Sequence, residues 1–191
     1  MFPSCATLTD IFDNVSIVVT ISRSPSAKKD AGHFNLLWIT PLLHHLLSLS
    51  LPSPNSLEDQ DLLGTMQEAS RRGIILFFAE IRRKCGDLGV PTEVQSKKLR
   101  AALSRPGWSR WALFEPLILW LLFFGALESE REDRGWFCNS MVLAARNLGV
   151  QEWKGVVGAG AGFLWIGDIF KARIKELRGG FDFDGLLCKR L

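Results

Sequence analysis

Tyrosine is absent from this chain, and only three of its 191 residues are histidine. Its aromatic residues are 13 phenylalanines and 7 tryptophans. Because these rings carry no hydroxyl group, the composition favours a dry core or an apolar contact surface over a hydrogen-bonding cleft. His44 and His45 are adjacent, so on a helix they point in different directions and cannot place two metal ligands on one face.

Cysteine is also sparse. The four cysteines are Cys5, Cys85, Cys138 and Cys188, and no two of them have the tight spacing of a zinc site. The chain is also not a small secreted scaffold that disulfides would have to hold together. We therefore predict four reduced thiols, no structural metal and no cofactor.

No apolar run is long enough to be a convincing membrane span. Phe34–Leu51 is interrupted by Pro41 and two histidines, and Pro116–Leu127 is shorter than the roughly 20 apolar residues that a span needs. Runs of this length are typical of buried core helices, so a membrane is an unlikely partner. A membrane-associated helical protein remains the first alternative. The net charge of +3 is too small to indicate nucleic acid, and no DNA-reading module is present, so we expect no sequence-specific DNA binding.

The periodicity of the apolar residues predicts an all-α fold. They recur at helical spacing from Leu63 to Cys85 and from Trp136 to Leu148. The predicted architecture is a single irregular bundle around the most apolar segment, Leu117–Phe124. Residues 34–191 form this domain, and residues 1–33 are a poorly ordered N-terminal extension.

Several local signals refine this expectation. Alternating apolar residues from Val15 to Ile21 indicate a strand. Pro41 either lies within one helix or separates two short pieces. Thr92 and Gln95 have capping-box spacing. The mixed charges of Glu128–Arg134 predict a solvated loop.

No catalytic constellation stands out. The glycines of Gly155–Gly162 fail the strict dinucleotide spacing, because Phe163 occupies the position of the last glycine, and no serine hydrolase elbow is present. Most carboxylates lie in charged loops rather than within apolar helices, where a raised pKa could be argued. We therefore predict no catalytic residues and no enzyme. An enzyme of unknown type is the second alternative.

One basic cluster gives the candidate contact residues, Arg72 and Arg83. At about 3.6 residues per turn they share a helix face away from the apolar stripe. A solvated face with ion pairs is the favoured interpretation, and a contact surface for an acidic partner is the alternative.

A family resemblance begins at Leu76–Gly86, LFFAEIRRKCG, and continues through Glu115–Leu127, EPLILWLLFFGAL. Trp136-Phe137, Leu148-Gly149-Val150 and Phe163-Leu164-Trp165 follow in order. Together they resemble the helical regulatory domain of fungal-specific transcription factors, which lies C-terminal to a binuclear zinc cluster. The likeness covers roughly Phe34 to Phe170. It departs from the family at the zinc cluster, because the six closely spaced cysteines are missing.

The resemblance implies a non-enzymatic regulatory or interaction domain in transcription regulation, without its own DNA-binding module. Its location would be the nucleus, or otherwise the cytoplasm. Its partner would be an unidentified protein or small-molecule effector.

Overall fold

The computed structural model describes residues 13, 15–16, 20, 31–48, 58–84, 91–105, 114–150, 152–161 and 167–178. Within these residues every regular element is a helix and none is a strand, which confirms the all-α class. The elements in chain order are α2 (Ala31–Ser48), α3 (Glu58–Lys84), α4 (Glu93–Leu103), α5 (Glu115–Leu127), α6 (Arg131–Asn147), α7 (Trp153–Ala161) and α8 (Gly167–Arg178).

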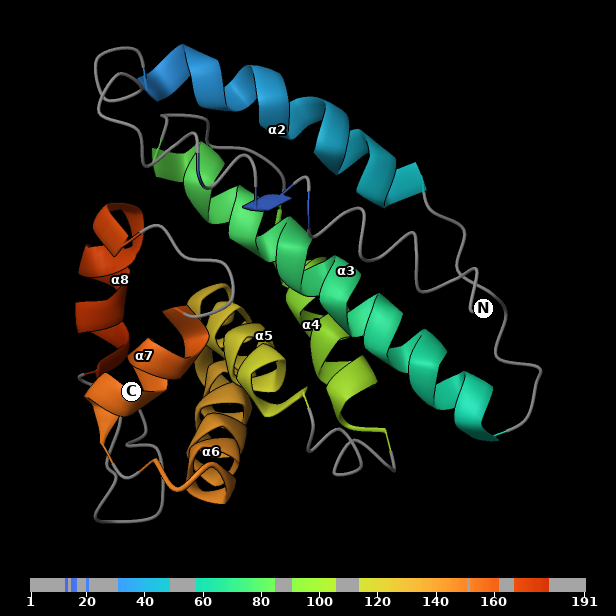
Figure 1. Ribbon diagram of the computed structural model, residues 1–191, viewed down its shortest axis with the longest axis vertical. Helices are drawn as coiled ribbons and strands as arrows, with labels where there is room; N and C mark the ends of the chain where they lie inside the picture. The colour runs from blue at the N-terminus through green and yellow to red at the C-terminus, as the bar shows by residue number, and fades with distance from the viewer. Residues whose placement is uncertain are drawn as a thin grey trace.

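The helices are arranged from α2 on one side of the molecule, through α3, to α7 and α8 on the other side (Figure 1). The long helix α3 lies between α2, which covers one edge, and α4 and α5. The last two helices, α7 and α8, lie on the opposite side from α2. Helix α5 contacts α3, α4, α6, α7 and α8. Because α8 touches both α3 and α5, the end of the described chain returns to its early part.

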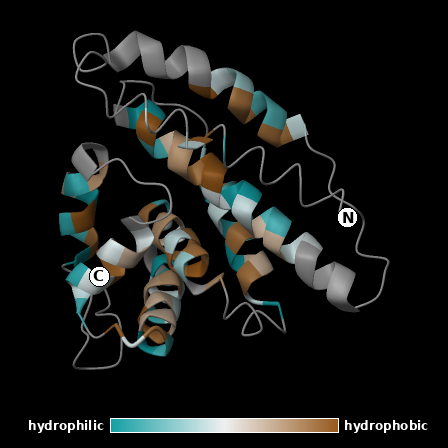
Figure 2. Ribbon diagram, in the orientation of Figure 1, coloured by the Kyte–Doolittle hydropathy of each residue, from teal (hydrophilic) through white to brown (hydrophobic). Residues whose placement is uncertain are grey.

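The packing of α5 follows from its composition. Every side chain from Leu117 to Leu127 is buried, and hydrophobic colouring marks this helix and the middle of α3 (Figure 2). Burial of a helix on all sides is expected when it is hydrophobic all round. Trp120 is fully buried, and its ring centroid lies 4.9 Å from that of Phe124 and 5.8 Å from that of Phe77. Phe124 also contacts Phe170, so aromatic rings join α3, α5 and α8.

The predicted capping box at the start of α4 is wrong. Thr92 has φ −87° and ψ −15° and makes no side-chain capping bond, whereas a capping side chain usually comes from a residue with extended backbone. Gln95 instead accepts a hydrogen bond from Arg72 on α3. The residues of this sequence signal are therefore used in tertiary contacts.

Two other local predictions fail. Val15, Ser16 and Thr20, the described part of the predicted strand, are helical, and Val15 is fully buried. In the predicted extension, residues 1–33, Asp13 is also helical, and α2 begins at Ala31. The other residues of the extension lie outside the part of the chain that the structure describes. The predicted loop Glu128–Arg134 is helical from Arg131, and Ser129 within it is only 3% exposed. Glu128, the buried charge of this segment, pairs with Arg83 on α3, which a local charge count cannot reveal.

Pro41 lies within one continuous helix and does not separate two short pieces, because α2 continues through this residue. Cys138 is buried and forms no disulfide, in line with the predicted reduced thiol, and the other cysteines lie outside the described residues. None of the helices that the structure describes has both the length and the apolar character needed to span a bilayer.

Candidate functional site

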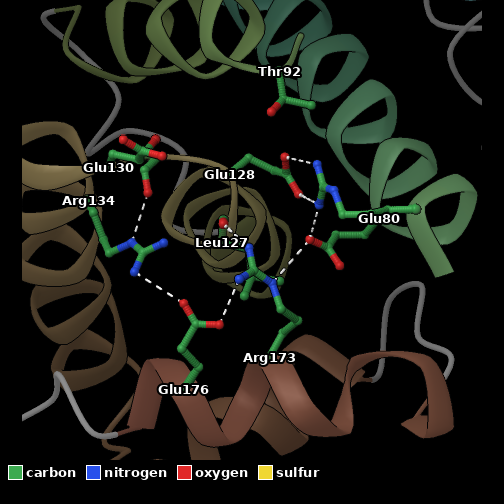
Figure 3. A pocket seen from close by; sticks show the side chains of 10 residues that line it. Glu80, Thr92, Leu127, Glu128, Glu130, Arg134, Arg173 and Glu176 are labelled. Atoms are coloured by element: carbon green, nitrogen blue, oxygen red, sulfur yellow. Dashed lines mark hydrogen bonds and ion pairs between the residues drawn. The ribbon is translucent and has the colours of Figure 1, made fainter. Parts of the chain in front are cut away.

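A pocket of about 540 Å³ opens where the ends of α3 and α5 meet the start of α6 and the middle of α8 (Figure 3). Its lining is mostly charged, which is unusual beside so apolar a core. We call it the charged pocket. The residues that line it are Glu80, Arg83, Thr92, Leu127, Glu128, Ser129, Glu130, Arg134, Arg173 and Glu176.

Arg83 and Glu128 form a two-point ion pair in this pocket. Arg83 Nη1 donates to Glu128 Oε1 at 2.7 Å, and Nη2 donates to Oε2 at 2.9 Å. The Glu128 side chain is 2% exposed and that of Arg83 is 40% exposed. Two parallel hydrogen bonds between a guanidinium and a carboxylate are the geometry in which this pair is strongest. They tie the end of α3 to the residue that follows α5.

Arg173 reaches from α8 to three acceptors on other parts of the fold and on its own helix. Its Nε donates to Glu80 Oε1 at 3.2 Å, and its Nη1 donates to Glu176 Oε2 at 2.6 Å. Its Nη2 donates to the Leu127 carbonyl at 2.6 Å. The last carbonyls of a helix lack partners within the helix, so this arginine satisfies one of them at the end of α5.

Arg134, in the second turn of α6, extends the network. Its Nε donates to the Ser129 carbonyl at 2.8 Å, and its Nη1 donates to Glu176 Oε1 at 3.3 Å. The Glu176 carboxylate therefore bridges Arg134 and Arg173 (Figure 3). This bridge connects α6 with α8, which are distant in sequence.

The two buried carboxyl groups have opposite pKa shifts. Burial, together with the hydrogen bond and charge of Glu128, raises the pKa of Glu80 from 4.5 to about 7 despite Arg173 and Arg83 nearby. Burial acts in the same direction on Glu128, but hydrogen bonds with Arg83, Glu80 and Thr92 lower its pKa. Near pH 7 Glu80 is therefore protonated in only about half of the molecules, while Glu128 stays ionised beside Arg83.

Ser129 contributes a polar atom without a partner. The residue is 3% exposed, and its Oγ accepts and donates no hydrogen bond. A buried hydroxyl without a partner is costly, so such groups in native structures call for an explanation. Because Ser129 lines the charged pocket, a bound molecule is one source of the missing hydrogen bond.

The chemistry of this arrangement favours recognition over bond-making. Glu80 has a pKa suited to proton transfer, but its side chain is only 1% exposed and faces the two arginines that pair with it. Ser129 has no base hydrogen-bonded to its hydroxyl. Among the described residues, no group of three or more histidine, cysteine, aspartate or glutamate side chains is placed to hold a metal ion.

The structure separates the two residues that the sequence singled out. Arg83 lies in the charged pocket, whereas Arg72 is only 7% exposed and is not on a solvated face, contrary to the sequence-based interpretation. Arg72 Nε donates to Glu68 Oε1 at 2.6 Å, and its Nη1 donates to Gln95 on α4. The two arginines are about 16 Å apart along the helix axis at a rise of 1.5 Å per residue. Arg72 thus joins α3 to α4 and does not contribute to the pocket.

Most of the residues that line the charged pocket are not indicated by the sequence. Glu80 did carry a signal, because it is a carboxylate within the apolar stretch from Phe77 to Ile81, and this corrects the view that the carboxylates lie mainly in loops. Glu128 and Arg134 were assigned to a solvated loop. Arg173 and Glu176 had no local signal, because nothing in the sequence around them indicates contact with residues of α3 or α6.

Comparison with protein-family models, curated proteins and solved structures gives no match to this chain. The interpretation of the site therefore depends on its own residues and geometry.

Proposed function

We propose that this chain is a non-enzymatic regulatory or interaction domain, of the kind that fungal-specific transcription factors carry beside their zinc cluster. In this proposal it acts in the nucleus, does not read DNA itself, and responds to a protein partner or a small-molecule effector. The order of apolar segments that resembles that family supports the proposal, and an all-α fold is compatible with it.

The charged pocket is the observation that carries the proposal. Its ion pairs connect α3, α6 and α8 with the end of α5. A molecule that enters it meets side chains from all of these elements at once. If such a molecule binds one arrangement of the helices more tightly than another, it increases the population of the first arrangement. A regulatory response requires a shift of this kind.

The proposal is tested by tethering the full chain to an unrelated DNA-binding domain in a fungal reporter strain. The expected result is a change in reporter transcription that Arg134→Gln alters and Lys97→Gln does not. Lys97 is an exposed residue of α4 outside the pocket, so it is the matched control. Circular dichroism and melting temperature must show that both variants are folded.

Two outcomes would contradict the proposal. One is a tethered chain that leaves the reporter unchanged while a fluorescent fusion stays outside the nucleus. The other is tight, sequence-selective binding of the isolated chain to DNA at physiological salt. Separation of the expressed chain between aqueous and membrane fractions tests the membrane-associated alternative.

A further inference from the structure

We propose that the charged pocket binds a small organic acid with a single carboxylate, and that Glu176 occupies the carboxylate subsite in the free protein. The subsite consists of Arg134 and Arg173, which we call the arginine clamp. This inference deepens the proposed regulatory function by naming a class of effector, and it rests on that function only for the consequence of binding.

The geometry of the clamp is that of a carboxylate receptor. Arg134 Nη1 lies 3.3 Å from Glu176 Oε1, and Arg173 Nη1 lies 2.6 Å from Oε2. One arginine thus holds each oxygen of a single carboxylate. Planar guanidinium groups recognise the two oxygens of a carboxylate with geometric specificity, and this arrangement would hold any carboxylate in the place of Glu176.

The two arginines are held in place independently of Glu176. Arg134 is bonded to the Ser129 carbonyl, and Arg173 is bonded to the Leu127 carbonyl and to Glu80. Their side chains are 20% and 26% exposed. If Glu176 leaves, both guanidinium groups keep their other hydrogen bonds. The clamp is therefore organised in advance, which lowers the cost of binding a ligand.

Glu176 is the part of the contact that is easily displaced. Its side chain is 46% exposed, and it lies in the last turn of α8, which ends at Arg178. A partly exposed ion pair contributes little to stability, so rotating this side chain into water costs little. The pocket beside it has about 540 Å³, within the range of sites for small molecules.

Ser129 supplies an independent observation that points to a ligand. Its buried Oγ has no hydrogen-bond partner although the residue lines the pocket and its own carbonyl anchors Arg134. Because this oxygen exposes less than 1 Å² of surface, a hydroxyl or carbonyl group of a ligand would satisfy it once the Ser129 side chain rotates toward the pocket. Occupation of the pocket would thus remove one of the two unpaired buried side-chain atoms among the described residues.

The remaining charges restrict the ligand to one negative group. Glu80 and Glu128 share Arg83, and Glu80 and Glu176 share Arg173, so the arginines that line the pocket have no unbalanced positive charge for a second negative group. Glu130 also lines the pocket, is exposed, and has no ion pair in the part of the chain that the structure describes. A second negative charge on the ligand would face this carboxylate, so citrate and inorganic phosphate should bind more weakly than a monocarboxylate.

Acetate is the probe that tests the clamp, with binding to the full chain followed by backbone amide NMR shifts at constant pH and ionic strength. Glu176→Ala removes the internal competitor and should tighten acetate binding by up to about fivefold, because a partly exposed ion pair holds Glu176 in the clamp only weakly. Adding Arg134→Gln to this variant should abolish the gain. Lys175→Ala, an exposed neighbour on α8 outside the pocket, should bind acetate like the wild type.

The expected shifts are confined to residues near 127–134 and 173–176. Affinity that does not increase in the Glu176→Ala variant, with its circular dichroism unchanged, would overturn the proposal. Stronger binding of citrate or phosphate than of acetate would overturn it as well. If the wild-type chain does not bind acetate but still changes reporter transcription, the arginine clamp is rejected and the regulatory function stands. If it binds acetate but leaves the reporter unchanged, the regulatory function is rejected.

Discussion

Gly73 on α3 lies so close to Leu121 on α5 that a Cβ atom added to the glycine would stand 2.3 Å from the leucine Cδ2. The same atom would stand 2.9 Å from Cζ3 of Trp120. The absence of a side chain at Gly73 is therefore what lets α3 and α5 approach this closely. Both obstructing side chains are buried in the core, so neither can move aside cheaply.

Gly73→Ala should destabilise the protein by about 1–3 kcal/mol, the usual cost of overpacking a core. Gly64→Ala is the matched control on the same helix, because nothing lies within 4 Å of its added Cβ. That control should gain up to about 1 kcal/mol from the higher helix propensity of alanine. Urea unfolding measures both, and equal effects at the two positions would contradict the close approach of α3 and α5.

Trp120→Asp should give insoluble or unfolded protein. The fully buried indole contacts Phe77 and Phe124, and the change places a charge in a desolvated site and leaves a void. Truncating a buried tryptophan alone costs roughly 3–5 kcal/mol. Lys98→Asp, on the exposed face of α4, should be tolerated. A soluble Trp120→Asp variant with an unchanged melting temperature would be incompatible with this core.

Glu80→Gln should stabilise the protein at pH 8 and have little effect near pH 4.5. Since the folded pKa of Glu80 is about 7, its protonated form contributes stability that is fully present below 4.5 and is lost as the pH rises through 7. The amide of the variant mimics the protonated acid at every pH. The gain at pH 8 is up to about 3 kcal/mol, at about 1.4 kcal/mol per pKa unit.

The measurement is a set of chemical denaturation curves between pH 4 and pH 8. Glu128 acts in the opposite sense, because its lowered pKa gives stability that is lost only as the pH falls below its ordinary range. Glu132→Gln changes a side chain that is 91% exposed and serves as the control. A Glu80→Gln variant that is less stable than the wild type at pH 8 would show that the ionised carboxylate stabilises the fold, which is incompatible with a raised pKa of Glu80.

Arg83→Met should destabilise the protein by about 3 kcal/mol at most, since it leaves Glu128 buried without its two-point partner. The figure is an upper limit because Arg83 is 40% exposed, so water screens part of the interaction. Adding Glu128→Gln should recover part of the loss. A double-mutant cycle by thermal unfolding measures the coupling, and strictly additive effects would contradict the pairing.

The sequence was sufficient for the parts of the fold that depend on local periodicity. The apolar stripe of α3 and the burial of Trp120 were predicted because a helix face repeats within a few residues. The pocket could not be predicted in this way. Arg83 and Glu128 are 45 positions apart, and Arg173 and Glu80 are 93 apart, so no local pattern indicates that they pair.

Arg72 illustrates the same limit within a single helix. Its position relative to the apolar stripe is that of an outward residue, and an isolated helix would expose it. Packing of α4 against α3 supplies Gln95 as a partner and buries it. Thr92 fails for a related reason, since its hydroxyl is used by Glu128 and not by the start of its own helix.

The long separation between Glu80 and Arg173 has a consequence for the order of folding. Helices α5 and α6 are neighbours in sequence and can associate early, whereas the contact from α8 to α3 closes a loop of most of the domain. Contacts of such high sequence separation form late, because the chain loses conformational entropy when the loop closes, before the contacts stabilise the fold. The charged pocket is therefore complete only when α8 has docked. A folding intermediate that holds α3 to α6 together would already have buried Trp120 and yet would have no arginine clamp. Ligand binding would therefore report completed folding, whereas the fluorescence of Trp120, in a variant that keeps it as the single one of the seven tryptophans, would report an earlier step.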